Sequence, residues 1–200
     1  MTTFVNVATE GGLDARVLQE IFRQAHLDLT IAEVFSAGGK GVLRRNVRRY
    51  FQSSRISTPF IVLTDLDNDR CAPELVEAWL GGSLPEERFQ IRAAVREFEA
   101  WLLASRQSMA SFLRVGLQRV PGQPDDLPDP KRTLVHLARL SRDRNLRDEI
   151  VARDRTRSSV GIGYNSRMAE FVRTTWNLAE ARSNSPSLER CVRALESMQA

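Results

Sequence analysis

Short apolar runs that alternate with segments of helical periodicity constrain the fold of this chain more than any other feature of its sequence. The clearest run, Pro59–Thr64, is rich in β-branched residues and bounded by turn residues, so it predicts a buried strand. Comparable strand patterns occupy residues 4–8, 30–35 and 89–95, with helical spacings at 14–26, after Gly39, at 72–80 and at 97–105. This alternation predicts a parallel sheet with right-handed crossovers.

A proline-rich segment divides the chain. Residues 121–130 contain four prolines in ten positions, and a helix cannot continue through them. We therefore expect an α/β core over residues 1–120 and a helical C-terminal extension over 121–200 that packs on the core. Its expected helices are 131–140, 146–152, 166–181 and a final one after Ser187, with a turn at 160–165.

Composition narrows the class of protein and of metal site. Apolar content of 42% and charged content of 27% are ordinary for a folded protein. No apolar stretch reaches the roughly 20 residues that span a bilayer, and the N-terminus lacks signal-peptide features, so we expect a cytoplasmic protein without a membrane segment. Cys71 and Cys191 are isolated, which disfavours structural zinc. A metal held by carboxylate oxygens would be Mg²⁺ or Mn²⁺.

Paired carboxylates follow the predicted strand at 59–64. Asp65 and Asp67 alternate with Leu66, so on an extended backbone both acids point to one side. Glu10 ends the first predicted strand, and the carboxyl ends of parallel strands meet at one edge of a sheet, where such folds place their ligands. Acids gathered in this way repel each other unless a cation or a basic group lies between them. We therefore expect a metal site formed by Glu10, Asp65, Asp67 and Asp69.

Further charged groups could join this chemistry. Glu97 and Glu99 follow the fourth predicted strand and could reach the same edge, and Lys131 is a candidate contact to the substrate or transition state. Several acids around a hard cation suit metal-assisted phosphoryl transfer.

The aspartate cluster has other interpretations. It can be a turn in which Asp side chains satisfy backbone N–H groups before the next helix. An EF-hand loop would need Gly and Glu where Arg70 and Val76 stand, so that interpretation fails. The paired aspartates of haloacid-dehalogenase-like phosphatases disagree with Asp69, where a small hydroxyl or aliphatic residue is expected.

Thr9-Glu10-Gly11 together with Asp65-Leu66-Asp67 resembles the Toprim domain, in which a Glu after the first strand and a DxD after the third bind Mg²⁺ or Mn²⁺. The wider chain, through residues 92–104, 129–131 and 161–165, resembles an uncharacterised bacterial Toprim-like family related to overcoming-lysogenization-defect nucleases. The resemblance implies a Toprim-like, mostly parallel four-stranded sheet flanked by helices. It also implies a second-metal role for Glu97 or Glu99, and an ATPase partner in phage defence.

Tyr50 and Tyr164 are the only tyrosines, and a chain of this size has no room for the separate DNA-gate domain of a topoisomerase. We expect Tyr50 in the core and Tyr164 in a structural or substrate-facing position. Hydrolysis by metal-bound water is the chemistry that the resemblance then implies.

A basic helix face is the second functional signal. The net charge is +4, and residues 34–64 contain no acid. In the helix after Gly39, apolar side chains gather on one face and arginines on the other, which predicts a nucleic-acid surface formed by Lys40, Arg44, Arg45, Arg48 and Arg49. The alternatives are a solvated face and an arginine-rich coding bias. The glycine-rich turn lacks the GxxxxGK pattern, so ATP hydrolysis is not expected.

In the extension, basic residues from Lys131 to Arg147 mix with acids, which is typical of surface ion pairs. Trp101 and Trp176 are expected in the core, and His136 is expected to be structural. We arrive at two hypotheses: a metal-dependent nuclease or other phosphodiester-acting enzyme, with DNA as the expected substrate, and a non-catalytic nucleic-acid or protein-binding module that works with an ATPase partner.

Overall fold

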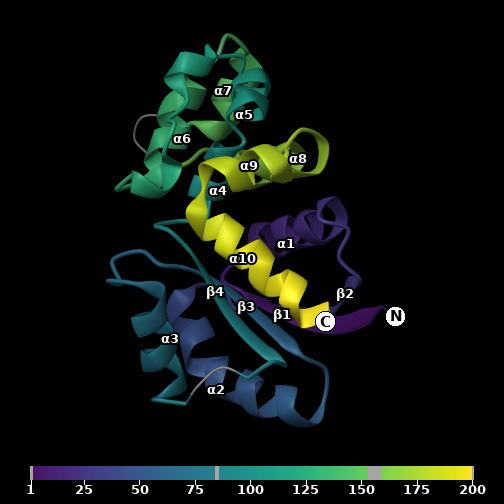
Figure 1. The fold of residues 1–200 in the computed structure, drawn as a ribbon. Coiled ribbons are helices and arrows are strands. Elements are labelled where there is room, and N and C mark those ends of the chain that lie inside the picture. The colour runs from purple at the N-terminus through teal and green to yellow at the C-terminus, as the bar shows by residue number, and fades with distance from the viewer. Residues whose placement is uncertain (1, 84–85, 153–158, 200) are drawn as a thin grey trace. The chain divides into compact units, whose positions relative to one another are not determined.

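Strands and helices alternate through the first half of the chain, as the sequence pattern predicts (Figure 1). The computed structural model describes residues 2–83, 86–152 and 159–199. Its first elements are β1 (Thr3–Thr9), α1 (Gly12–Gln24), β2 (Leu29–Ser36), α2 (Lys40–Ile56), β3 (Phe60–Asp65), α3 (Ala72–Leu80) and β4 (Phe89–Ala94). The strands form a four-stranded sheet in the order β2-β1-β3-β4, and every pairing is parallel. The predicted α/β class is confirmed, and the topology agrees with a Toprim-like fold.

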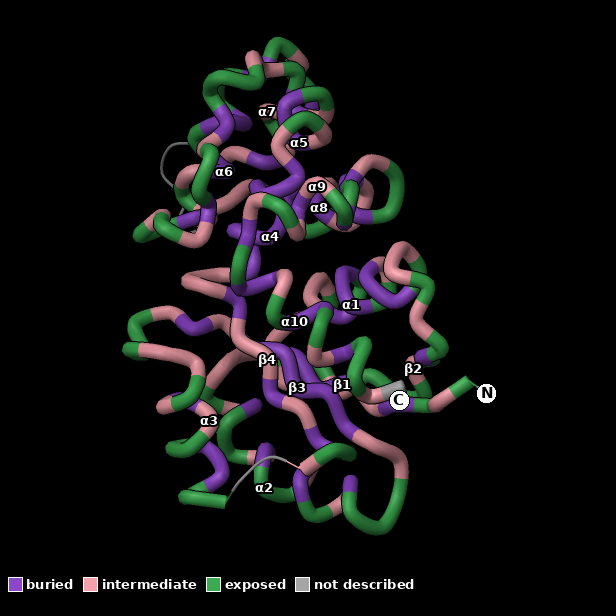
Figure 2. Tube along the Cα trace, viewed as in Figure 1, coloured by how far each residue is buried: buried purple, intermediate pink, exposed green. Residues whose placement is uncertain are grey.

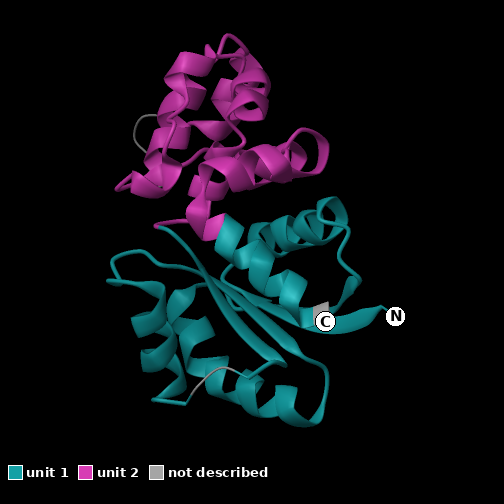
Figure 3. Cartoon of the chain, in the orientation of Figure 1, with its two compact units in different colours: residues 1–95, 189–200 teal, residues 96–188 magenta. Residues whose placement is uncertain are grey.

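The chain divides into two compact units (Figure 3). Unit 1 comprises residues 1–95 and 189–200, and unit 2 comprises residues 96–188. This division does not coincide with the expected boundary at 120/121. The proline-rich segment at 121–130 lies inside unit 2, where it connects helices of one packed group. The end of the chain returns to unit 1, which a reading along the sequence does not reveal.

The core of unit 1 surrounds β3, whose first five residues are all buried (Figure 2). The apolar face of α2, formed by Leu43, Val47 and Phe51, packs with α3 against one side of the sheet. On the other side, α1 contributes buried Val17 and Leu18 among others. Because both faces of β3 are covered, this central strand is a nearly continuous apolar run, which is typical of parallel sheets.

Unit 2 is built around α4 (Glu99–Ala104), in which every residue is buried. The other elements are α5 (Arg106–Leu113), η1 (Leu117–Arg119), η2 (Pro124–Asp126), α6 (Pro130–Arg139), α7 (Arg144–Ile150), α8 (Tyr164–Thr174), α9 (Leu178–Asn184) and the start of α10 (Pro186–Glu196), which precedes η3 (Ser197–Gln199). Trp101 is fully buried and donates from Nε1 to Ser187 Oγ at 2.8 Å. Trp176 is 3% exposed and donates to the Trp101 carbonyl at 3.0 Å. The expected core positions of both tryptophans are confirmed.

Two helix predictions in unit 2 need correction. The single helix expected at 166–181 is two helices, because Asn177 caps α9 by accepting the Glu180 backbone N–H at 2.8 Å. The turn expected at 160–165 ends earlier, since α8 already begins at Tyr164. The sequence pattern also left α5 unassigned. Within the residues that the structure describes, no helix is both long and apolar enough to cross a membrane.

The packing around β3 predicts how unit 1 responds to a cavity. Leu63 is 1% exposed in the centre of the sheet, so Leu63→Ala is expected to lower the free energy of unfolding by about 2–5 kcal/mol. Val34 on β2 is 49% exposed, and Val34→Ala is expected to change the free energy of unfolding by less than about 1 kcal/mol. Urea denaturation measures both variants. Equal destabilisation by the two would contradict this description of the core.

Candidate active site

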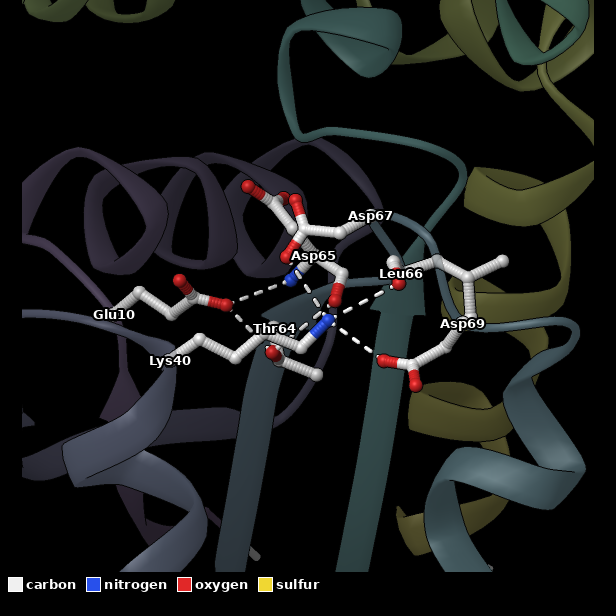
Figure 4. Close-up of polar contacts among 7 residues, drawn as sticks. All are labelled: Glu10, Lys40, Thr64, Asp65, Leu66, Asp67 and Asp69. Carbon is white, nitrogen blue, oxygen red and sulfur yellow. Dashed lines mark hydrogen bonds and ion pairs between the residues drawn. The ribbon is translucent and has the colours of Figure 1, made fainter. Parts of the chain in front are cut away.

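Glu10 and Asp65 meet at the carboxyl edge of the sheet in unit 1 (Figure 4). The parallel register pairs Thr9 with Leu63, so the residues that follow β1 lie beside the end of β3. Glu10 Oε1 accepts a hydrogen bond from Thr64 Oγ1 at 2.6 Å and another from the Asp65 backbone N–H at 3.0 Å. The two donors fix the Glu10 carboxylate beside Asp65.

The turn after β1 also has a fixed form. Thr9 Oγ1 donates to the Gly11 carbonyl at 2.7 Å, and the Gly11 N–H donates to Asp14 Oδ2 at 3.0 Å. These contacts tie the residues on both sides of Glu10 to the start of α1. Glu10 is therefore presented by a hydrogen-bonded turn, which limits the side-chain positions available to it.

Lys40 connects α2 to the acidic turn that follows β3. Its Nζ donates to Asp67 Oδ2 at 2.9 Å, to Asp69 Oδ2 at 2.8 Å and to the Leu66 carbonyl at 3.1 Å. Burial of the ammonium lowers the pKa of Lys40, but the hydrogen bonds to Asp69 and Asp67 and their negative charges outweigh burial, so the pKa is raised. Lys40 was expected to contact nucleic acid; in the structure its ammonium binds carboxylates of its own chain.

The glycine-rich turn before α2 explains how Lys40 reaches these acids. Gly38 and Gly39 have φ values of 75° and 135°, which residues with a side chain rarely adopt. The Gly38 N–H donates to the Glu10 carbonyl at 3.0 Å, so the start of α2 is held beside the end of β1. Asp67 also has a positive φ of 50°. Left-handed turns on both sides thus bring the ammonium and the carboxylates together.

The predicted metal site can be compared with this geometry. Among residues 2–83, 86–152 and 159–199, no three acidic, histidine or cysteine side chains are close enough to share one ion. The Lys40 ammonium supplies positive charge to Asp67 and Asp69. Mg²⁺, however, is usually bound by only one or two protein carboxylates, with water and substrate phosphate completing its shell. Glu10 and Asp65, at the ends of neighbouring strands, are the two predicted ligands that Lys40 does not contact in the described part of the chain.

Glu97, Glu99 and Lys131 form a separate group of contacts within unit 2. Glu99 is 4% exposed, and its Oε1 accepts from the Tyr164 hydroxyl at 2.9 Å and pairs with Lys131 Nζ at 3.1 Å. Glu97 Oε2 accepts the Lys131 backbone N–H at 2.9 Å. Burial raises the pKa of Glu97, and this N–H opposes the rise. Tyr164 is 2% exposed, which favours a structural role for this residue over a position that faces the substrate.

The arginine face of α2 has the predicted form. Arg44, Arg45, Arg48 and Arg49 are exposed on the side opposite the buried residues of the helix. The Arg48 guanidinium lies directly against Gly81, at the left-handed end of α3, where any side chain would collide with it. Arg48 thus also packs within unit 1.

The sequence pattern did not indicate a functional role for Thr64 or for three basic residues of α6. Thr64 belongs to the apolar run of β3, but its hydroxyl holds Glu10; a polar residue directly before the acids is the signal that could have indicated this role. His136, expected to be structural, is exposed and lines a pocket together with Arg132 and Arg139. Spacings of four and three residues along one helix are the signal for that group.

Comparisons of the chain with protein-family models, with curated proteins and with solved structures found no match.

The ion pairs of Lys40 predict a pH-dependent contribution to stability. Lys40→Met is expected to lower the free energy of unfolding by about 1 kcal/mol at pH 7, because it removes partly exposed ion pairs. Since folding raises the pKa of Lys40, this contribution is fully present below its ordinary value of 10.5 and is lost as the pH rises through the folded value. Urea denaturation between pH 7 and 11 measures it. Arg44→Met on the same helix is the control, and an equal effect of both variants would contradict the assignment.

Proposed function

We propose that this protein is a Mg²⁺- or Mn²⁺-dependent phosphodiester-acting enzyme, a nuclease with DNA as its expected substrate. One observation carries the proposal: Glu10 and Asp65 come from the ends of two neighbouring parallel strands, and Glu10 is hydrogen-bonded to the Asp65 backbone. Two hard oxygen donors at the carboxyl edge of a parallel sheet are suited to an ion that also binds a substrate phosphate.

Each residue at this edge of the sheet has a distinct proposed role. Glu10 and Asp65 would hold the ion, and Asp67 is the third proposed ligand, which shares its Oδ2 with Lys40. When bound, a divalent ion polarises a phosphate oxygen and lowers the pKa of water. Thr64 orients Glu10, and Lys40 holds the acidic turn while its positive charge reduces the repulsion between these acids and a phosphate. Asp69 stabilises this turn through its ion pair with the same Lys40 ammonium.

Catalytic roles for Glu97, Glu99 and Lys131 rest on the Toprim-like resemblance, together with the ion pair between Lys131 and the buried carboxylate of Glu99 within unit 2. An ATPase partner, a place in phage defence and a cytoplasmic location also rest on the resemblance and on the composition of the chain.

Substitution of the proposed ligands tests the enzyme directly. Glu10→Gln and Asp65→Asn are each expected to reduce Mn²⁺-stimulated cleavage of plasmid DNA by about 100-fold or more, because a lost ligand removes several kcal/mol of charge stabilisation. Both changes preserve side-chain size, and circular dichroism verifies the fold. Glu33→Gln, an exposed acid on β2, is the matched control. Wild-type cleavage by both ligand variants would refute the proposal.

A non-catalytic nucleic-acid-binding module is the second candidate. It is favoured by the Lys40 contacts, because an ammonium already balances two of the four predicted metal ligands. It is favoured also by the exposed arginines of α2, whose guanidinium groups suit phosphate contacts. Under this candidate the protein binds DNA but does not cleave it with any divalent ion.

Neutralisation of the arginine face tests binding separately from cleavage. The triple variant R44Q/R45Q/R49Q is expected to weaken binding of duplex DNA and to reduce the slope of log K against log salt by about 0.9 for each lost phosphate contact. Fluorescence anisotropy at several salt concentrations measures this slope. The variant R16Q/R119Q/R142Q removes the same charge from exposed positions on other segments. An equal effect of the two variants would show that only net charge matters.

A further inference from the structure

A pocket with a volume of about 530 Å³ lies beside α6 in unit 2. The described residues that line it include Glu97, Asp129, Lys131, Arg132, His136 and Arg139. A volume of this size is in the range of small-molecule binding sites. Its lining residues do not include Glu10, Asp65, Asp67 or Asp69, so the pocket and the candidate active site share no residue of that acidic group.

Basic side chains line one side of this pocket in a regular order. Arg132, His136 and Arg139 are spaced by four and then three residues, which places them in a row on one face of α6. All three are exposed, and their side chains form no hydrogen bond or ion pair with any residue in the described part of the chain. The row therefore presents donors to the pocket that the fold itself does not use.

The acids of the pocket are engaged differently. Asp129 caps α6 and accepts the Arg132 backbone N–H at 2.7 Å, while Glu97 accepts the Lys131 backbone N–H at 2.9 Å. The Lys131 ammonium pairs with Glu99 at 3.1 Å. Both lining acids are thus bound to the first turn of α6. The basic row continues along the helix beyond them.

We propose that this pocket binds a phosphate-bearing ligand through Arg132, His136 and Arg139. Neighbouring members of the row are about one helical turn apart, roughly 5–6 Å between Cβ atoms, and two such side chains can hold one phosphate. A diphosphate can contact all three members. The guanidinium fork makes bidentate, charge-assisted hydrogen bonds to phosphate oxygens, which is why arginine is preferred for this ligand.

The chemistry is shared by two sources of phosphate, a small phosphorylated molecule and the 5′-phosphate of a nucleic-acid strand. Isothermal titration of the full-length protein with inorganic pyrophosphate, with inorganic phosphate and with ADP probes the first source. Fluorescence anisotropy with a short single strand, with and without a 5′-phosphate, probes the second. All titrations contain EDTA, so they do not depend on a divalent ion at Glu10 and Asp65.

The double variant R132Q/R139Q is expected to weaken binding of pyrophosphate by about tenfold or more, because it removes charge-assisted hydrogen bonds to the phosphate oxygens. His136→Gln is expected to cause a smaller loss. The control R119Q/R173Q removes two exposed arginines of unit 2 that do not line the pocket, and it is expected to bind as the wild type does. Thermal unfolding checks that all the variants fold.

The proposal is overturned if no phosphate probe binds the wild-type protein, or if the control pair loses as much affinity as the pocket pair. A loss confined to the pocket variants supports it, and the probe that shows the loss identifies the source. Because the measurement excludes metal, failure here leaves the cleavage test of Glu10 and Asp65 unaffected, and failure of that test leaves this one intact.

Discussion

The parallel pairing of β1 with β3 is the constraint on which the candidate active site depends. The register sets Thr9 beside Leu63, so the residue that follows β1 comes into contact with the last two residues of β3. Glu10 then accepts hydrogen bonds from the Thr64 hydroxyl and from the Asp65 N–H. A shift of one residue in this register would turn Thr64 and its neighbours to the opposite face of the sheet and separate the acids.

Lys40 gives this edge its electrostatic balance. Carboxylates gathered at a strand end need positive charge, and here an ammonium from the first residue of α2 supplies it to Asp67 and Asp69. The same balance is repeated within unit 2, where Lys131 pairs with the buried carboxylate of Glu99. In both places the lysine lies in the first turn of a helix. Lysine ammonium groups of the protein itself thus offset the repulsion between clustered carboxylates and the desolvation of a buried one.

Much of this arrangement is predictable from local sequence. The β-branched run before Asp65 and the apolar periodicity of α2 predict their elements within a residue or two, because burial on a strand or a helix leaves a period of two or of 3.6. The sequence pattern does not predict the division into α8 and α9, because the apolar spacing continues past Asn177. In the structure, the Asn177 side chain caps α9 and so begins a new helix. The unit boundary was missed because a proline-rich loop can connect helices as readily as domains.

Three features are predictable from the amino-acid sequence alone: the parallel α/β class, the placement of Glu10 and Asp65 at one edge, and the amphipathic face of α2. These follow from short-range patterns and from the rule that parallel strands end together. Two features become apparent in the three-dimensional contacts: Lys40 binds Asp67 and Asp69, and one pocket is lined by Arg132, His136 and Arg139. Partners of a charged side chain come from segments distant along the chain, and the positive φ values at Gly38, Gly39 and Asp67 that orient those segments leave little trace in a hydrophobic pattern.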